Sequence, residues 1–300
     1  MASVGERERT GVLAAVLSSA LGGSAAAITR YAIGASDPVT LAAFRFGVAF
    51  VLIFPLALAT RAKWPSARDW PGVAALGVLF FSVFFVIYNV ALSYTTAARG
   101  SLALSTLPLT TMVVAALLGK EALTRRKTAG VLVAMLGVGA ALWTGLANAP
   151  AGAWRGDVTM AVGTLCMALY NVWSRPFMLR SSRLGFLAGG MGCGAAASVA
   201  FAAGTGGLAA TQAFSAAQWI AVIALGVFGG AAAFYLWVYA LERTTPTRVA
   251  NTMTVNPIAA SLLGAALVGE ALSPNLLVGL VGVGIGIWIA STQAAPPARA

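Results

Sequence analysis

Ten apolar segments, each close to the length of a membrane-spanning helix, follow one another along this chain of 300 residues. The hydrocarbon core of a bilayer is about 30 Å thick, and a helix of about 20 apolar residues crosses it. The segments cover residues 11–33, 40–60, 71–92, 97–118, 128–146, 157–176, 184–203, 218–241, 246–268 and 275–292. Their apolar runs are continuous, whereas the strands of a membrane barrel alternate apolar and polar residues. The sequence therefore predicts an all-α integral membrane protein with ten transmembrane helices and short loops.

Composition supports a membrane protein and argues against several classes of function. Apolar residues make up 59% of the chain and charged residues only 9%, whereas a soluble domain carries about 25% charged residues. The chain contains no histidine and only eight acidic residues, which excludes a histidine metal site and a Ser-His-Asp triad. Asp37, Asp69 and Asp157 lie far apart near the segment ends, which disfavours an intramembrane protease. We therefore expect no enzyme activity, no metal and no cofactor.

The distribution of Lys and Arg predicts how the chain is oriented. The amino-terminal segment, alternate gaps and the carboxyl-terminal tail hold fifteen basic residues, whereas the other five gaps together hold only Arg155. Cytoplasmic loops of membrane proteins carry an excess of Lys and Arg. The net charge of +11 therefore indicates membrane topology rather than nucleic-acid binding. Both termini are predicted to be cytoplasmic.

An internal repeat divides the chain into two halves. Shifting the sequence by 149 residues aligns residues 66–141 with 215–290 without a gap, and 23 of the 76 aligned positions are identical. Each repeat holds five predicted helices, so the second copy must enter the membrane in the opposite orientation. Inverted repeats are a building plan of secondary transporters, which hold their substrate near the membrane midplane. We predict a first repeat over residues 1–147, a second over 148–292 and a disordered cytoplasmic tail over 293–300.

Short motifs shared by the two halves resemble a known family. The Glu-Ala-Leu triplets at 121–123 and 270–272, the Thr-Thr pairs before Arg99 and Arg248, and the entry of Arg45 into the second helix are similar to the EamA repeat of the drug/metabolite transporter superfamily. The resemblance covers essentially the whole chain. It implies ten helices in a 5+5 inverted fold and export of small metabolites across the bacterial inner membrane. Within the superfamily, the chain most resembles the YddG-type bacterial amino-acid exporters.

Polar and aromatic side chains inside the predicted helices are candidates for contacts with a substrate. An unpaired amide in hydrocarbon is costly, so each should face the interior of the bundle. Amides, hydroxyls and rings around one cavity suit a zwitterion with an apolar side chain. The same groups also form hydrogen bonds between helices without any ligand, which is the alternative. The candidates are Ser24, Tyr88, Asn89, Ser105, Tyr170, Asn171, Asn251, Thr254 and Asn256.

Pro108 and Pro257 occupy equivalent positions of the two repeats, in the middle of the predicted fourth and ninth helices. A proline inside a helix removes a backbone hydrogen bond and kinks the helix. The pair is a candidate for two hinges beside the substrate, and static kinks are the alternative.

An aromatic row runs along the predicted third helix. Its members recur at helical spacing: Phe81, Phe84, Phe85 and Tyr88. We expect the row to form a stripe that faces lipid.

Two crossed charge pairs are predicted between the repeats. Arg248 and Glu121 are expected near the cytoplasmic face, and Arg99 and Glu270 near the outer face. Each arginine would meet the glutamate of the other repeat. Both glutamates precede a predicted helix, where negative charge is favoured, so their roles are expected to be structural rather than catalytic.

The predicted function is export of small metabolites by alternating access, with amino acids that carry aromatic or other apolar side chains as the first expectation. The expected partners are the small substrate and the lipid bilayer, and the expected state is a monomer. None of the acidic residues lies near the middle of a predicted helix, and arginine does not deprotonate in proteins. Transport is therefore predicted to be facilitated uniport, driven by the substrate's own gradient.

Other carriers of the same superfamily remain alternatives. A proton-coupled exporter would need an acidic residue in the cavity, and Glu242 is the first residue to suspect. A multidrug carrier is a second alternative. A nucleotide-sugar carrier would need basic groups for phosphate, for which only Arg30, Arg45 and Arg99 are available. A channel would be expected to show rings of charge or a carbonyl filter, and neither is evident.

Overall fold

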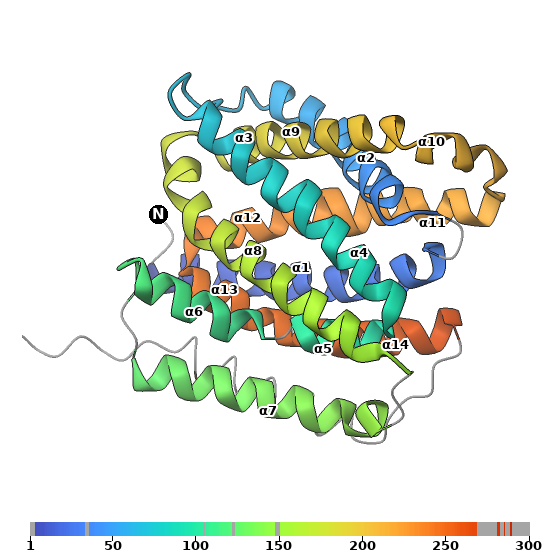
Figure 1. Ribbon diagram of the computed structural model, residues 1–300. Coiled ribbons are helices and arrows are strands. Elements are labelled where there is room, and N and C mark those ends of the chain that lie inside the picture. The colour runs from blue at the N-terminus through green and yellow to red at the C-terminus, as the bar shows by residue number, and fades with distance from the viewer. Residues whose placement is uncertain are drawn as a thin grey trace, which may run out of the picture.

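The computed structural model describes residues 4–33, 36–104, 106–121, 124–147 and 151–268, together with Val281, Gly282, Ile285 and Ile289. Within these residues the fold is all-helical, without a β-strand (Figure 1). The α-helices are α1 (Val4–Ala32), α2 (Pro38–Ala59), α3 (Trp70–Val78), α4 (Phe85–Tyr94), α5 (Ala97–Leu104), α6 (Leu107–Leu117), α7 (Arg125–Ala147), α8 (Ala153–Arg180), α9 (Arg183–Gly204), α10 (Gly207–Ala210), α11 (Ala216–Gly226), α12 (Ala233–Arg243), α13 (Pro246–Asn251) and α14 (Asn256–Val268).

Local sequence signals fix several helix starts. Asp37 caps α2, because its carboxylate accepts hydrogen bonds from the backbone amides of Val39 and Thr40. Ser215 and Gln218 form a reciprocal capping box at the start of α11. These caps satisfy backbone donors that a helix leaves free at its first turn.

Several helices are long enough to cross a bilayer. By length and composition, five in the described part of the chain qualify: Gly5–Ala32, Pro38–Ala59, Trp70–Tyr94, Arg183–Gly204 and Ala216–Arg243. The predicted tenth segment, residues 275–292, lies outside the described residues except for the four named above. The count of ten transmembrane helices therefore stays a prediction.

The third helix of each half changes its winding at an equivalent place. A π-helical segment, Leu79–Phe84, joins α3 to α4, and another, Val227–Ala232, joins α11 to α12. Gly77 and Gly226 precede these segments and are equivalent in the repeat. A side chain on Gly77 would meet the backbone of Gly190 in α9, and one on Gly226 would meet Val48 in α2. Glycine therefore lets each third helix approach a second helix of the other half closely.

The predicted fourth and ninth helices are interrupted rather than kinked. α5 ends at Leu104 and α6 begins at Leu107, while a 3₁₀ turn, Thr252–Val255, separates α13 from α14. Pro108 and Pro257 each lie at the second residue of the following helix. The prediction that these prolines lie in the middle of a helix is therefore wrong. A proline is tolerated in the first turn of a new helix, because the backbone amide that it lacks would form no intrahelical hydrogen bond there.

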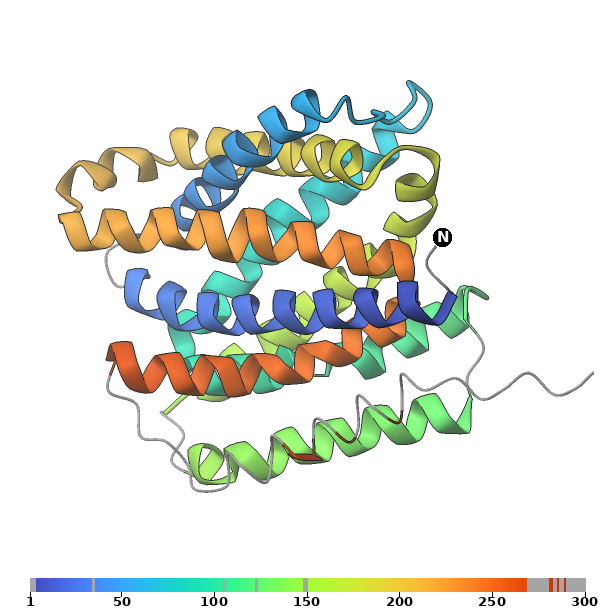
Figure 2. The ribbon, with the colours of Figure 1, turned by 180° about the vertical axis from the view of Figure 1, so that it is seen from behind.

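The two halves interdigitate. α1 packs against α12 and α14 of the second half, and Figure 2 shows it running between α11–α12 and α13–α14. In the same way α8 packs against α4, α5 and α6 of the first half, and α2 packs against α9. The first helix of each half therefore lies against the third and fourth helices of the other half.

The aromatic row of the third helix is buried, so the prediction of a lipid-facing stripe is wrong. Phe80, Phe81, Phe84, Phe85 and Tyr88 are all at most 4% exposed. The helix is packed on more than one side, by α8, α9 and α2. Periodicity identified a continuous face of the helix but not what covers that face.

Candidate functional site

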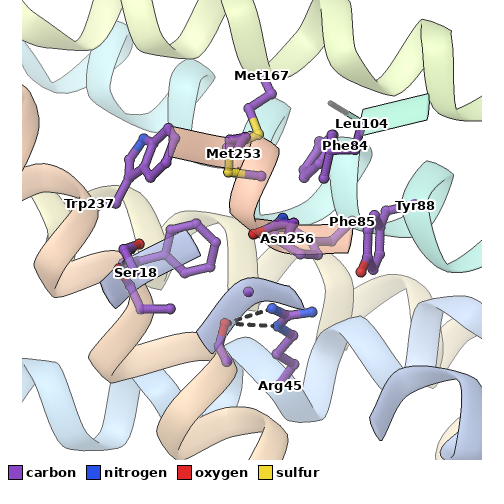
Figure 3. A pocket seen from close by; sticks show the side chains of 14 residues that line it. Ser18, Arg45, Phe84, Phe85, Tyr88, Leu104, Met167, Trp237, Met253 and Asn256 are labelled. Atoms are coloured by element: carbon purple, nitrogen blue, oxygen red, sulfur yellow. Dashed lines mark hydrogen bonds between the residues drawn. The ribbon is translucent and has the colours of Figure 1, made fainter. Parts of the chain in front are cut away.

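A cavity lies between the two halves, near the middle of several helices (Figure 3). Its free volume is about 40 Å³, which is room for a few water molecules. It is lined by Ser18, Gly22, Arg45, Phe84, Phe85, Tyr88, Leu104, Met167, Gly229, Ala233, Phe234, Trp237, Met253 and Asn256.

Both halves contribute equally to this central cavity. Several lining residues occupy equivalent places in the repeat: Phe84 and Ala233, Phe85 and Phe234, Tyr88 and Trp237, Leu104 and Met253. Because equivalent residues of both repeats surround it, the cavity lies at their junction. This is the place where transporters built from repeats hold their substrates.

Arg45 places a cation in this cavity. It lies on α2 and is only 3% exposed. Its Nε and Nη2 atoms both donate to the backbone oxygen of Gly229, at 3.2 and 2.6 Å. A side chain on Gly229 would crowd both Arg45 and Ala25. Glycine at this position of the π-helical segment therefore lets the guanidinium reach the backbone of the other half.

Asn256 supplies an amide at the first residue of α14. Its side chain is buried, and a Cβ on Gly22 of α1 would meet its amide, while a Cβ on Gly23 would meet its backbone oxygen. In the described part of the chain, no hydrogen-bond donor reaches Asn256 Oδ1. A buried acceptor without a donor is costly, so this oxygen is available to a ligand.

Aromatic rings form the apolar wall. The guanidinium of Arg45 lies 4.4 Å from the ring centre of Phe85, in the range of a cation–π interaction. Phe85 in turn contacts Phe234 edge-on, with ring centres 5.6 Å apart. The cavity thus combines one cation and one amide with aromatic surface. No Asp or Glu is among its lining residues in the part of the chain that the structure describes.

Of the nine predicted contact residues, Tyr88 and Asn256 line the central cavity. Ser105 lies outside the described residues. Ser24 is half-buried on α1 and is not among the lining residues. Asn251 is buried, and neither atom of its side-chain amide has a partner among the described residues.

The other four predicted residues make contacts between or within helices. Asn171 accepts a hydrogen bond from Trp237 Nε1 at 3.0 Å, and Asn89 Nδ2 donates to the oxygen of Pro38 at 2.8 Å. Thr254 donates to the backbone of its own helical turn. Tyr170 stacks on Phe80 with ring centres 4.2 Å apart. These contacts correspond to the alternative of hydrogen bonding and packing without a ligand.

Sequence reasoning left several lining residues out of the predicted contacts. Arg45 is the most important of them, since as a ligand contact it was named only as a candidate basic group for phosphate. The signal was available, since an arginine inside an apolar segment normally faces the bundle interior. Ser18 was also missed. Its hydroxyl donates to the oxygen of Ala233 at 2.7 Å, which joins α1 to α12.

The end of the bundle that holds the chain's amino terminus is joined by charged contacts. Arg248 forms an ion pair with Glu8 of α1, and Glu121 accepts from the backbone amide of Thr247 at 3.3 Å. Glu121 therefore meets the start of α13 across the halves, while a direct pair between Glu121 and Arg248 stays a prediction. The side chain of Arg99 and all of Glu270 lie outside the described residues.

Further ion pairs connect helix ends and loops at the same end of the bundle. Glu242 at the end of α12 pairs with Arg183 at 2.7 Å and with Arg243 at 2.9 Å. Asp69, before α3, pairs with Arg180 of α8 at 2.6 Å. The hydrogen bond from Arg180 lowers the pKa of the Asp69 carboxyl below its ordinary value of 3.8, and one from Ser66 adds to the effect.

Apolar helices in two repeats around a central cavity define a multi-pass membrane protein of the transporter type. Comparison with known families identifies which type. The EamA-like transporter family matches residues 9–143 and again residues 154–292. The chain therefore belongs to the EamA-like transporter family, in the drug/metabolite transporter superfamily.

Individual proteins agree with this assignment. An uncharacterized transporter of Archaeoglobus fulgidus is 24% identical over 268 residues, which covers 87% of this chain and 91% of that protein. The uncharacterized transporter YcxC of Bacillus subtilis is 23% identical over 287 residues, covering 92% and 90%. A protein of known crystal structure has a TM-score of 0.71 at 22% identity, covering 95% of this chain and 96% of that chain, and so shares the fold.

Proposed function

We propose that this transporter exports amino acids with aromatic or other apolar side chains from the cytoplasm across the bacterial inner membrane. The central cavity carries the proposal. It holds a guanidinium for a carboxylate, an amide oxygen for an ammonium group, and the rings of Phe85, Phe234 and Trp237 for an apolar side chain. A zwitterion with an apolar body uses all three kinds of surface.

The proposed architecture is ten transmembrane helices in a 5+5 inverted repeat with both termini cytoplasmic. The bias of Lys and Arg toward alternate gaps supports the orientation. The interdigitation of α1 and α8 with the opposite halves supports a pseudo-two-fold relation between the repeats. We place their boundary between residues 147 and 148, with a cytoplasmic tail from residue 293.

Alternating access is the proposed mechanism. The cavity volume of about 40 Å³ is far smaller than the about 300–1,000 Å³ of typical pockets for small ligands. Helices must therefore move to admit a substrate. The interruptions before Pro108 and Pro257 lie beside the cavity residues Leu104 and Asn256, which makes them the proposed hinges.

The proposed mode of transport is facilitated uniport, which is driven only by the substrate's own gradient. The lining residues in the described part of the chain include no Asp or Glu that would exchange a proton with the substrate path. Glu242 is held by two arginines at the end of α12 instead. Proton-coupled export is the alternative. It would require Glu242 or another acidic residue to reach the cavity.

A competition panel tests the substrate class. The purified protein would be placed in liposomes, and uptake of labelled L-phenylalanine measured against excess amino acids, cationic drugs and nucleotide sugars. The proposal expects competition by apolar amino acids and little by the other two classes. Competition confined to cationic drugs would establish a multidrug carrier, and competition confined to nucleotide sugars would establish that type of carrier.

A further inference from the structure

One side-chain nitrogen of Arg45, Nη1, forms no hydrogen bond within the described residues. Nε and Nη2, on one edge of the guanidinium, both donate to the oxygen of Gly229. Nη1, on the other edge, is buried and has no hydrogen-bond acceptor among the described residues. Guanidinium groups carry five N–H donors in a fixed fork. Leaving buried donors of a charged group unpaired is costly, so Nη1 needs an acceptor. Water can supply it in the empty cavity, and a bound substrate can replace that water.

The neighbours of Arg45 fix the direction of its free edge. Gly229 holds one edge, and the ring of Phe85 lies against the group with 4.4 Å between ring centre and guanidinium carbon. The side chain borders the central cavity, where Figure 3 shows it with Tyr88 and Asn256. The arginine is therefore held in place before any ligand arrives, so little rotamer entropy remains to be lost on binding.

The positive charge of the guanidinium favours an anion as the ligand that Nη1 binds. No carboxylate of the chain is among the described lining residues, so no internal counter-ion competes for the guanidinium inside the cavity. Arginine pairs with a carboxylate through short, charge-assisted hydrogen bonds, which are about twice as strong as neutral ones. The other lining groups are mostly apolar or aromatic, which suits a ligand with one charged end and an apolar body.

We propose that Nη1 of Arg45 binds the carboxylate of the transported substrate, and that Oδ1 of Asn256 accepts a hydrogen bond from its ammonium group. The inference rests on the proposed function for the ammonium contact but not for the carboxylate contact. Arg45 is then the residue that makes the carrier require a carboxylate. The two tethering bonds to Gly229 place this contact on the boundary between the halves, so the substrate bridges both repeats.

Wild-type protein provides the first test. Liposomes with the purified carrier would take up labelled L-phenylalanine while unlabelled competitors are titrated. L-phenylalaninamide keeps the ring and the ammonium group but has a neutral amide in place of the carboxylate. We expect it to compete at least tenfold more weakly than L-phenylalanine itself. Equal competition by the amide would overturn the inference without any variant being made.

Variants separate a contact with substrate from a structural role. Arg45→Gln should raise the KM for L-phenylalanine at least tenfold and should abolish the preference for L-phenylalanine over its amide. Arg45→Lys, which keeps the charge, should retain part of that preference. Arg30→Gln is the matched control, because Arg30 also donates to a carbonyl of another helix, that of Leu92 at 2.9 Å, but does not line the cavity. It should leave the preference unchanged.

The outcomes also distinguish this inference from the proposed function. If L-phenylalanine is carried and Arg45→Gln keeps the full preference for the carboxylate, the inference fails and amino-acid transport stands. If labelled 3-phenylpropionate is carried in an Arg45-dependent manner while L-phenylalanine is not, the carboxylate contact stands and amino-acid export fails. If folded carrier moves neither compound, both fail. Should Arg45→Gln not fold, the wild-type comparison and Arg45→Lys decide the question.

Discussion

The guanidinium of Arg45 holds the backbone oxygen of Gly229 with two hydrogen bonds across 184 residues of sequence. One partner lies on the second helix of the first half, and the other lies in the π-helical segment of the second half. A local departure from α-helical winding often marks a functional site. Here it brings a carbonyl of one repeat to a buried cation of the other, at the edge of the cavity between them.

Replacing Gly229 by alanine should weaken this junction. The new Cβ would lie 2.7 Å from the Cβ of Ala25 and 3.2 Å from Nη2 of Arg45. We expect a loss of about 1–3 kcal/mol in the free energy of unfolding, as for other overpacked sites, together with a raised KM. Thermal unfolding in detergent measures the first effect. Gly204→Ala is the control, since nothing lies within 4 Å of a Cβ at that position, and it should be neutral.

The orientation is testable by labelling single cysteines. Thr205→Cys and Lys120→Cys would be introduced singly after Cys166 and Cys193 have been replaced by alanine. Thr205 directly follows α9, and Lys120 follows α6. A membrane-impermeant thiol reagent added to intact cells should label Thr205→Cys only, and permeabilisation should expose Lys120→Cys. Labelling of both positions in intact cells would show that the predicted topology is wrong.

The ion pair between Glu8 and Arg248 should stabilise the packing of α1 on α13. Its side chains are only 16% and 10% exposed, respectively. We expect Arg248→Gln to cost about 1–3 kcal/mol in unfolding free energy, between the values for exposed and fully buried pairs. Thermal unfolding measures the loss. The charge swap of Glu8→Arg with Arg248→Glu should recover part of it, and a swap no better than the sum of its single changes would argue against a direct pair.

Asp69 should make stability depend on pH only in strong acid. The folded state lowers the pKa of this carboxyl below 3.8, so its contribution is fully present above that value. The contribution is lost as the pH falls through the lower folded-state pKa. Asp69→Asn should therefore lower the unfolding temperature at pH 7 but flatten the acid side of the profile. Ser181→Ala, at the nearby end of α8, should leave the shape of the profile unchanged.

Glu242→Gln tests whether transport needs a proton carrier. Because this carboxylate is paired with Arg183 and Arg243 outside the cavity, we expect downhill uptake to stay within about a factor of two of wild type once the folded fraction is matched. An imposed pH gradient should not concentrate substrate in either protein. Accumulation against the gradient in wild type that disappears in Glu242→Gln would establish proton coupling through this residue.

Within the described residues, sequence patterns predicted the helical segments because a membrane helix is defined by local properties, namely length and apolar content. The interruption of the fourth and ninth helices was less visible, because Pro108 and Pro257 are compatible with either a kink or a new helix. The burial of the row from Phe81 to Tyr88 depends on which helices pack around it, and such packing has no local signature. In an apolar chain, a lipid-facing ring and a core ring look alike.

The candidate site was predictable only in part. Tyr88 and Asn256 were chosen as polar groups in apolar segments, and both line the cavity. Asn171 met the same criterion but is bonded to Trp237, because a polar residue marks the interior without saying whether its neighbour is protein or ligand. Arg45 gave the strongest local signal, yet its role depends on a backbone oxygen of the other half of the chain.

Counterflow of L-phenylalanine tests the central claim most directly. Liposomes that contain the purified protein would be loaded with unlabelled L-phenylalanine and diluted into a trace of the labelled compound, with no pH, sodium or electrical gradient. A carrier that alternates its access should accumulate label transiently inside and then lose it as the two pools mix, with a rate that saturates as the substrate concentration rises. Label that only equilibrates, at a rate proportional to concentration, would indicate a pore and contradict the account. Entry no faster than into protein-free liposomes would contradict amino-acid transport altogether.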